Sequence, residues 1–286
     1  MSSRLLDYVQ KATEFDPAGT LLPFNIGMAR VGWLKPSFAE ELNTWPELFS
    51  VRPRGVGVTG EFETADQRSL AIGEAVEGLA SAGYIQGWRN EQVDVLEYFG
   101  ALPSFHIERA ATRYFGITVY GVHLNGLTVR DSQPCMWLAR RASSKAIDPA
   151  KLDNLAAGRV SRGQTPASTL IKEAFEEAGM PEALAKQAKS AGATHTCHEV
   201  PEGLHDEIVF VHDLILGADF TPVNQDGEVS EFVCQPIAGV MQMLDDAPEQ
   251  FTTDAALVIV DCLIRRGYLT PARKDFVELM RALRVR

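Results

Sequence analysis

Alternating apolar and polar positions predict extended segments in both halves of the chain. Over residues 1–100, this alternation and its flanking glycines favour strands at residues 24–34, 54–60 and 93–99. From about residue 114 the extended segments become longer and richer in Val and Ile. There we expect strands at residues 115–130, 135–141, 207–216 and 228–237.

Helix signals stand between these strands. Ser37 with Glu40, and Thr64 with Gln67, have the spacing of a capping box, in which a side-chain oxygen accepts a hydrogen bond from a backbone N–H of the first turn. The second helix is expected to end at Gly83, because glycine tolerates the left-handed backbone that closes many helices.

The same pattern suggests how the chain is divided. Residues 254–284 are typical of two helices broken around Gly267 and Pro271. Because the character of the strands changes near residue 113, we expect a small α+β N-terminal extension at 1–113 and a larger α/β domain at 114–286.

Composition limits the partners of the protein. The 286 residues include 27 Lys and Arg against 38 Asp and Glu, a net charge of −11. Such a charge repels phosphate backbones and anionic lipids, so nucleic acid and membrane surfaces are excluded as general partners. A phosphate-bearing small molecule would need a local cluster of cations. The oligomeric state cannot be inferred from these features.

Cysteine spacing and apolar runs indicate a cytoplasmic protein. Cys135, Cys197, Cys234 and Cys262 are scattered without paired spacing, which favours reduced thiols. The most apolar late stretch, residues 255–264, is too short to span a bilayer and contains an aspartate. The N-terminal sequence lacks the basic and apolar regions of a signal peptide.

A charged helix after a glycine-containing loop carries the most informative chemistry. Thr165 is a plausible N-cap, Pro166 suits the first helical position, and Gly179 ends the helix. At 100° per residue one arc holds three acids, Glu173, Glu176 and Glu177, and another holds Ile171, Ala174, Phe175 and Ala178. We expect the acids to face outward and Phe175 to anchor the helix to a core.

The clustered acids require an explanation, because like charges three or four residues apart repel by roughly 0.2–0.5 kcal/mol per pair. A solvated helix face is the ordinary explanation. The preceding loop favours another, since Gly158 and Gly163 permit sharp turns and Arg159 and Arg162 supply cations. Cations followed by clustered carboxylates suit a phosphate ester bridged to magnesium, which prefers oxygen ligands.

Two other ligand sites were considered along the chain. Residues 158–165 have the glycine frame of a phosphate-binding P-loop, but Gln164 replaces the lysine and Pro166 removes a backbone N–H. His195, Cys197 and His198 lie close together, yet no second ligand pair accompanies them, so an ordinary strand is favoured over a zinc site.

The spacing of the helix residues resembles a known signature. Gly158, Lys172-Glu173, Glu176-Glu177 and Gly179-Met180 fit the Nudix box, Gly-x5-Glu-x7-Arg-Glu-apolar-x-Glu-Glu-x-Gly-apolar. Gln164 replaces the first glutamate of the box, and Lys172 replaces its arginine.

These departures resemble one branch of the family, the Nudix domain fused to thiamine pyrophosphokinase in fungi, with plant chloroplast and bacterial relatives. That branch also has an N-terminal extension before the Nudix fold. Segments similar to the branch occur along most of the chain, at residues 87–95, 107–126, 211–216, 226–232 and 258–269.

The resemblance implies an α/β/α sandwich with a mixed sheet. It implies that Glu173, Glu176 and Glu177 bind metal and act in catalysis, that Gly158 shapes the loop, and that Lys172 replaces an arginine which orients a glutamate. Lysine keeps the charge but loses the planar two-pronged donor. Gln164 cannot be an anionic ligand. Arg159, Arg162 and Gly158 are the expected substrate-binding residues.

The resemblance further implies a magnesium-dependent hydrolase of an organic diphosphate, with manganese as an alternative metal. Thiamine diphosphate, or its oxidised and otherwise damaged forms, is the expected substrate, cleaved to the monophosphate and phosphate. Two alternatives stay open. ADP-ribose or another nucleoside diphosphate derivative could be the substrate, or the domain could bind a nucleotide or coenzyme without cleaving it.

Several further side chains could contribute to a site. We expect His123 and His212 to be hydrogen-bonded core histidines, because both stand in apolar strands. Glu228 and Glu231 could supply another acid or base. The aromatic and basic candidates are Trp33, Trp88, Tyr120 and Trp137 for ring stacking, and Arg109 and Arg113 for a phosphate.

Overall fold

The computed structural model describes residues 3–284 and contains a mixed seven-stranded sheet between two helical layers. The strand order is β11-β12-β7-β8-β13, with β10 paired to β7 and β9 to β8. Only the β12–β7 pairing is parallel within this sheet. The strands are β7 (Val119–Arg130), β8 (Gln133–Arg141), β9 (Leu152–Asp153), β10 (Ala156–Arg159), β11 (Lys189–Val200), β12 (Gly203–Ile215) and β13 (Val229–Pro236).

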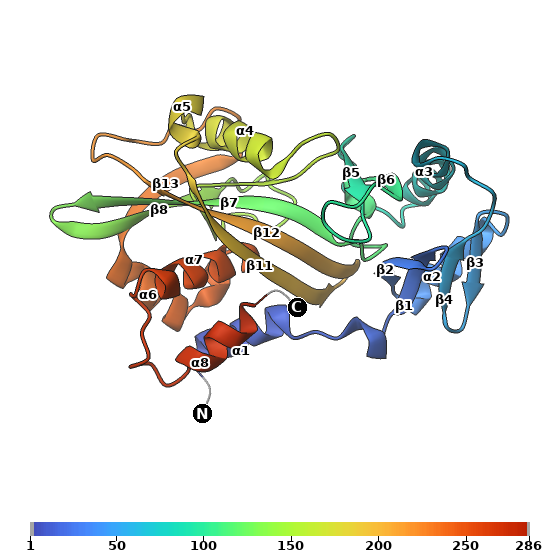
Figure 1. Cartoon of the computed structure of the whole chain (residues 1–286), viewed down its shortest axis with the longest axis horizontal. Coiled ribbons are helices and arrows are strands. Elements are labelled where there is room, and N and C mark those ends of the chain that lie inside the picture. Colours follow the sequence, from blue (N-terminus) through green and yellow to red (C-terminus); the bar gives the residue numbers. More distant parts are fainter. Residues whose placement is uncertain (1–2, 285–286) are drawn as a thin grey trace.

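Helices cover both faces of this sheet, as Figure 1 shows. α4 (Pro166–Ala178) and α5 (Glu182–Ala185) lie above the sheet in that view, and α6 (Ile237–Asp246) and α7 (Thr253–Arg265) lie below it. This is the expected α/β/α sandwich. Among residues 3–284, no helix is long and apolar enough to cross a membrane.

The strands predicted in this domain are confirmed, but the sequence pattern missed β11. Its residues are mostly Ala, Gly, Ser, Thr and His, so it lacks the Val and Ile alternation that marks its neighbours. Pairing sustains it instead, because β11 is hydrogen-bonded to β12 from the Lys189–Asp213 pair to the Val200–Gly203 pair.

The N-terminal unit has its own small sheets and core. A four-stranded sheet runs in the order β2-β1-β4-β3, and a separate hairpin pairs β5 with β6. Phe24, Phe49, Phe105 and Phe115 pack together in its centre. The elements are β1 (Leu22–Ile26), β2 (Ala29–Leu34), α2 (Pro36–Glu41), β3 (Phe49–Arg52), β4 (Gly55–Val58), α3 (Ala65–Ser81), β5 (Gln92–Val95) and β6 (Phe105–Glu108).

One predicted helix cap in this unit is confirmed and one is wrong. Thr64 and Gln67 form the expected capping box at the start of α3. The box expected from Ser37 and Glu40 does not form, because α2 begins at Pro36, two residues before the start that a cap at Ser37 would give. Lys35 is then the N-cap, and its side chain makes no capping hydrogen bond.

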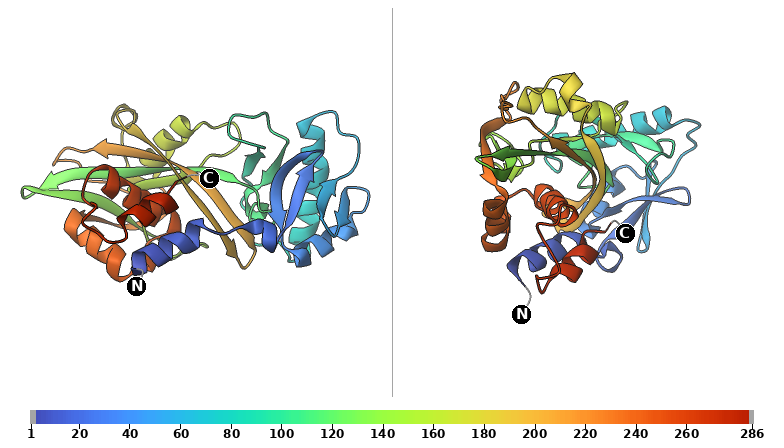
Figure 2. Two further views of the ribbon diagram at one scale, coloured as in Figure 1. Left: turned by 60° about the horizontal axis from the view of Figure 1, so that its bottom comes forward. Right: turned by 60° about the vertical axis from the view of Figure 1, so that its left-hand side comes forward.

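The helix nearest the N-terminus packs with the helices nearest the C-terminus. Leu5, Leu6, Val9 and Ala12 of α1 (Arg4–Thr13) share a core with α6, α7 and α8 (Phe276–Ala282). Figure 2 shows α1 beside the red C-terminal helices. The segment expected as one N-terminal extension therefore has two parts: α1 packs with the C-terminal helices, and the rest forms the N-terminal unit. The domain boundary at residue 113 remains a proposal.

The glutamate-rich helix α4 has the predicted ends but a different orientation. Thr165 accepts a hydrogen bond from the Ser168 N–H, and Gly179 closes the helix with a left-handed φ of 62°. The prediction that Phe175 anchors the helix is wrong, because this ring is 55% exposed. Leu170 and Ala174 pack into the core, and Glu177 is buried rather than facing outward.

Candidate functional site

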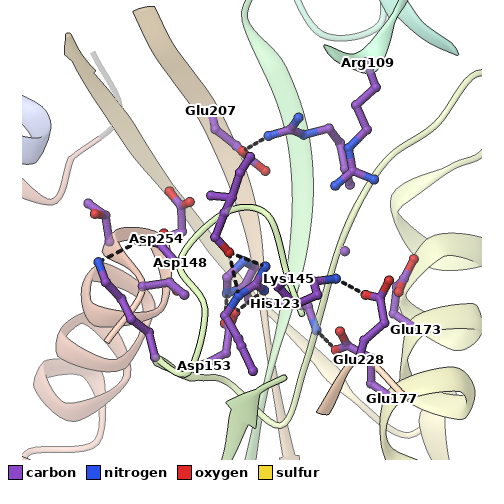
Figure 3. A pocket seen from close by; sticks show the side chains of 18 of the residues that line it. Arg109, His123, Lys145, Asp148, Asp153, Glu173, Glu177, Glu207, Glu228 and Asp254 are labelled. Atoms are coloured by element: carbon purple, nitrogen blue, oxygen red, sulfur yellow. Dashed lines mark hydrogen bonds and ion pairs between the residues drawn. The ribbon is translucent and has the colours of Figure 1, made fainter. Parts of the chain in front are cut away.

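A cavity of about 650 Å³ lies between α4, the central sheet, the start of α7 and the N-terminal unit. Figure 3 shows Glu173, Glu177 and Glu228 gathered on one side of this cavity and Asp254 on the other. The cavity also has several cationic residues in its wall. These are Arg89, Arg109, Arg113, Arg141, Lys145, Lys151, Arg159 and Lys172.

The three acids of α4 all line the cavity, as the sequence predicts. Lys172 lies against two of them and donates hydrogen bonds to Glu173 Oε1 over 3.1 Å and to Glu176 Oε2 over 2.8 Å. Its ammonium group offsets the repulsion between these carboxylates, and they in turn raise the pKa of Lys172 above its ordinary value despite partial burial. The ammonium group of Lys172 thus lies between the carboxylates of Glu173 and Glu176.

Gly158 lies in β10 rather than in the loop where it was expected, and its missing side chain makes room for Glu173. A Cβ atom at this position would come within 2.3 Å of both Cγ and Cδ of Glu173. These distances are too short for any real contact, so a side chain at this position would force the Glu173 side chain to move. Gly158 therefore sets how closely α4 approaches the sheet.

Glu177 is the most deeply buried acid of the group. Its Oε2 accepts a hydrogen bond from the Ala157 N–H over 2.8 Å. Burial, and then the nearby carboxylate of Asp153, raise the pKa of Glu177 well above its ordinary value. Burial also raises the pKa of Glu173, although Lys172 opposes that shift.

This donor set fits a divalent metal ion. The carboxylates of Glu173, Glu176 and Glu177 provide hard oxygen ligands on one side of a cavity, which suits Mg²⁺ or Mn²⁺. A bound cation would favour the ionised forms of Glu173 and Glu177, whose burial otherwise disfavours charge.

The two acids considered on β13 and its preceding turn lie in different places. Glu228 lines the cavity and is paired with Lys145, whose charge holds the pKa of Glu228 below its ordinary value against the effect of burial. Glu231 does not line the cavity, and its carboxylate pairs with Arg140 over 3.0 Å. Only Glu228 is placed to contribute.

The predicted phosphate-binding cations are also divided. Arg159 lines the cavity, with its guanidinium 2.6 Å from Glu207 Oε2. Arg162 lies outside the cavity, where it bonds Asp66 and Gln92 of the N-terminal unit. Its expected place among the substrate-binding residues is therefore corrected, because the side chain does not reach the cavity. The loop directs its side chain towards α3 and β5 instead.

Gln164 also points away from the acids. Its Oε1 accepts a hydrogen bond from the Ser168 hydroxyl over 2.8 Å at the exposed start of α4. The expectation that this residue marks a vacated metal-ligand position is not supported, because the side chain lies outside the cavity wall.

Among the aromatic candidates, only Trp88 lies near the cavity. It is 39% exposed and lines a smaller pocket that shares Arg89, Lys145 and Glu228 with the main cavity. The other three rings pack within the protein. Trp33 lies under Arg30, Tyr120 packs with Phe99 and Phe210, and Trp137 lies under Arg130.

The histidines separate between two faces of the sheet. His195 and Cys197 project to one face, where His195 Nε2 lies 2.6 Å from Asp206 Oδ1. His198 projects to the other face and lines the cavity, since neighbouring residues of a strand alternate in direction. The three residues therefore do not converge on one metal.

The two expected core histidines are both hydrogen-bonded. His123 is buried, and its Nδ1 lies 2.7 Å from Asn154 Oδ1, although the residue also lines the cavity. His212 is only half-buried, and burial lowers its pKa. Its Nδ1 lies 3.3 Å from the Phe210 carbonyl oxygen.

Several residues of the cavity wall were not predicted. Asp153 comes from β9, His205 and Glu207 come from β12, and Asp254 comes from the start of α7. Lys145 lies in the segment between β8 and β9. His205 and Glu207 share one face of β12, but no local spacing links that pair to Asp153, Lys145 or Asp254, which only the fold brings to the same cavity.

Comparison with known proteins agrees with this arrangement. Residues 4–119 match a family model described as a domain of unknown function, DUF4743, and residues 120–255 match the NUDIX domain. Nudix hydrolase 20, chloroplastic, from Arabidopsis thaliana is 34% identical over 94% of this chain and 74% of its own length. Nudix hydrolase 24, chloroplastic, from the same plant is 33% identical over 99% and 79%.

Solved structures include a similar domain. The NUDIX domain of Shewanella oneidensis NrtR, complexed with ADP ribose, is 15% identical, covers 53% of this chain and 90% of its own, and has a TM-score of 0.43. The plant relatives and the NUDIX match together show that the chain belongs to the Nudix hydrolase family and is an enzyme of that type.

Proposed function

We propose that this Nudix hydrolase cleaves a thiamine-type diphosphate, either thiamine diphosphate or an oxidised or damaged form, to the monophosphate and phosphate. The observation that carries the proposal is the cavity itself. It places three carboxylates of α4 beside a cationic wall, and its volume of about 650 Å³ suits a small organic ligand. The substrate class is suggested by the sequence resemblance to the thiamine pyrophosphokinase-fused branch.

The residues of this chain have distinct parts in the proposed reaction. Glu173, Glu176 and Glu177 would hold Mg²⁺, or Mn²⁺, which when bound supplies positive charge to the phosphoryl oxygens. Arg159, Arg109 and Lys145 line the cavity and would hold the diphosphate in place. Water attacks the terminal phosphorus and a carboxylate of α4 accepts its proton, while the bond from that phosphorus to the bridging oxygen breaks and the monophosphate leaves.

We also propose a cellular location for the protein. The four cysteines are free thiols, which suits a reducing compartment, and we propose a cytoplasmic location. The two plant relatives carry the word chloroplastic in their names.

A substrate panel tests the proposal. Thiamine diphosphate, its oxidised analogues, ADP-ribose, NADH and a nucleoside triphosphate are each incubated with Mg²⁺ or Mn²⁺, and the products are identified. We expect a thiamine-type diphosphate to give the highest kcat/KM. A clear preference for ADP-ribose would overturn the substrate class but keep the hydrolase, and tight binding without turnover of any compound would overturn catalysis.

A further inference from the structure

Three side chains converge on the face of β11 and β12 opposite to the cavity. We call them the hairpin cluster, and they are His195, Cys197 and Asp206. Their ligand atoms, a nitrogen, a sulfur and an oxygen, all lie within 4.8 Å of one another. His195 and Cys197 alternate with Thr196 on β11 and so share a face, and Asp206 of β12 stands directly opposite Cys197. The proposed hydrolysis uses none of the three.

Hydrogen bonds hold the carboxylate of the hairpin cluster in place. Asp206 Oδ1 lies 2.6 Å from His195 Nε2, and Asp206 Oδ2 accepts a hydrogen bond from the Thr118 hydroxyl over 2.7 Å. Metal-binding carboxylates are commonly oriented by such a donor on the second oxygen. The side chains of His195 and Asp206 are 19% and 12% exposed, so an ion from solvent reaches ligands that are already largely desolvated.

The three ligand types suit zinc rather than magnesium. Sulfur and imidazole nitrogen are ligands that Zn²⁺ favours, whereas Mg²⁺ takes oxygen. Around a tetrahedral Zn²⁺, with bonds of about 2.0–2.3 Å, such atoms stand about 3.3–3.6 Å apart. The contact between His195 and Asp206 would have to open by less than about 1 Å from its 2.6 Å. A water molecule completes four ligands.

The charges around the thiol also favour a cation. Burial, and then the carboxylates of Asp206 and Asp16, raise the pKa of Cys197 to about 12. The thiol therefore keeps its proton in the absence of an ion, and the same two carboxylates attract a positive charge. When the metal binds, the thiol proton passes to solvent and a sulfur–metal bond forms, with no change of oxidation state.

We propose that the hairpin cluster is a structural Zn²⁺ site that joins β11 to β12, separate from the carboxylates of α4. β11 is the edge strand of the sheet, and its composition gives it little preference for an extended backbone (Figure 1). An ion held by two residues of β11 and one of β12 fixes the register of the two strands. Phe15 and Leu21, in the segment between α1 and β1, share an apolar cluster with Cys197, so the ion stabilises their packing as well.

Cobalt tests this site, because Co²⁺ substitutes for Zn²⁺ and a bond between Co²⁺ and a thiolate has its own charge-transfer absorption. The full chain is titrated with Co²⁺ in excess Mg²⁺, and the oxygen ligands of α4 contribute nothing to this absorption. We expect an equimolar amount of Co²⁺ to produce the absorption and an equimolar amount of Zn²⁺ to remove it. Zn²⁺ should also raise the melting temperature by at least about 3 °C.

Matched variants assign the ligands. Cys197→Ser should abolish the absorption and weaken Zn²⁺ binding by at least about tenfold, since loss of a residue that merely supports a ligand already costs about 10–100-fold. Cys234→Ser makes the same change at a half-buried thiol of β13 and should behave as wild type. His195→Ala should also weaken Zn²⁺ binding at least about tenfold, with His212→Ala, at a half-buried histidine of β12, as its control. All four variants should keep the wild-type kcat with Mg²⁺.

Three results would overturn the inference. One is wild type without the thiolate absorption in excess Co²⁺, and another is absorption that survives in Cys197→Ser. The third is wild-type affinity for Zn²⁺ in His195→Ala, which decides alone if Cys197→Ser does not fold. Each of them leaves the proposed hydrolysis intact, because the hairpin cluster lies outside the cavity.

Discussion

At Gly158 the backbone of β10 lies so close to α4 that hydrogen is the only side chain that fits. The space a methyl group needs is filled by Cγ and Cδ of Glu173, each 2.3 Å from the position of a Cβ. The spacing between β10 and α4 therefore depends on the absence of a Cβ atom at Gly158.

Replacing Gly158 with alanine is expected to displace Glu173 and lower kcat by at least about tenfold, since small displacements of catalytic groups have effects of this size. Metal affinity should fall as well. Phosphate release titrated against Mg²⁺ measures both. Gly73→Ala is the matched control, because a Cβ there has no neighbour within 4 Å. Unchanged activity in Gly158→Ala would show that Glu173 moves freely without loss.

Glu177 gives a prediction about pH. Its pKa is raised in the folded protein, chiefly by burial, so the unfolded chain loses this proton at lower pH than the folded one. The folded state is then penalised as pH rises above the ordinary glutamate range. In chelator, Glu177→Gln should melt higher than wild type, by roughly 2–4 °C per kcal/mol relieved, with a larger difference at pH 8 than at pH 5.

Adding Mg²⁺ should reverse that order. A ligand that binds only the folded state raises its melting temperature, and wild type keeps all three carboxylates while the variant does not. Melting curves at both pH values, with and without Mg²⁺, decide the matter. Equal differences at pH 5 and pH 8 would mean that Glu177 does not titrate as its burial requires.

Among the elements, α4 was predictable and β11 was not. The limits of α4 follow from local signals at Thr165, Pro166 and Gly179, which act within one turn of the backbone they fix. Its orientation depends on the sheet beneath it, so the exposure of Phe175 could not be inferred. β11 has no local signal of its own and forms only because β12 pairs with it.

The candidate site likewise contains residues that the sequence predicts and residues that it does not. The acids of α4 share one sequence signature, and all three line the cavity. Glu207 and Asp254 are 47 positions apart in the sequence, yet both line the cavity because β12 and the start of α7 meet there. Convergence of this kind is a property of the tertiary structure, and a pattern of residue types along the chain does not contain it.

The helix α1 offers a test of stability at this scale. Leu5 is 1% exposed in the core shared with α6, α7 and α8. Leu5→Ala should lower the free energy of unfolding by about 2–5 kcal/mol while leaving kcat of the folded enzyme unchanged. Denaturant titration and an activity assay measure the two effects. Met28→Ala, at a fully exposed position, is the control and should change neither.

In the whole molecule, the N-terminal unit completes the cavity of the Nudix domain. It contributes Arg89, Arg109 and Arg113 to a wall that the other domain supplies with carboxylates. The molecule carries a net charge of −11, so these arginines provide the positive potential that an anionic substrate needs.

Arg89 is the exposed member of this set and the best one to remove. Arg89→Ala should raise KM for the diphosphate about tenfold, equivalent to roughly 1.4 kcal/mol, with little change in melting temperature. Steady-state kinetics at two salt concentrations measure the effect, which should shrink at high salt. Arg54→Ala, an exposed arginine of the same unit outside the cavity, should behave as wild type. Equal KM values in both variants would exclude Arg89 from substrate binding.

The packing of α1 against α7 has a consequence during synthesis. Tyr8 and Thr253, which lie 3.3 Å apart through their hydroxyl groups, are separated by 245 positions in the chain. At roughly 5–20 residues per second, a ribosome makes α7 about 12–50 s after α1. During that interval α1 lacks the C-terminal helices that complete its core, so a nascent chain of this protein exposes part of an apolar surface of the kind that chaperones bind.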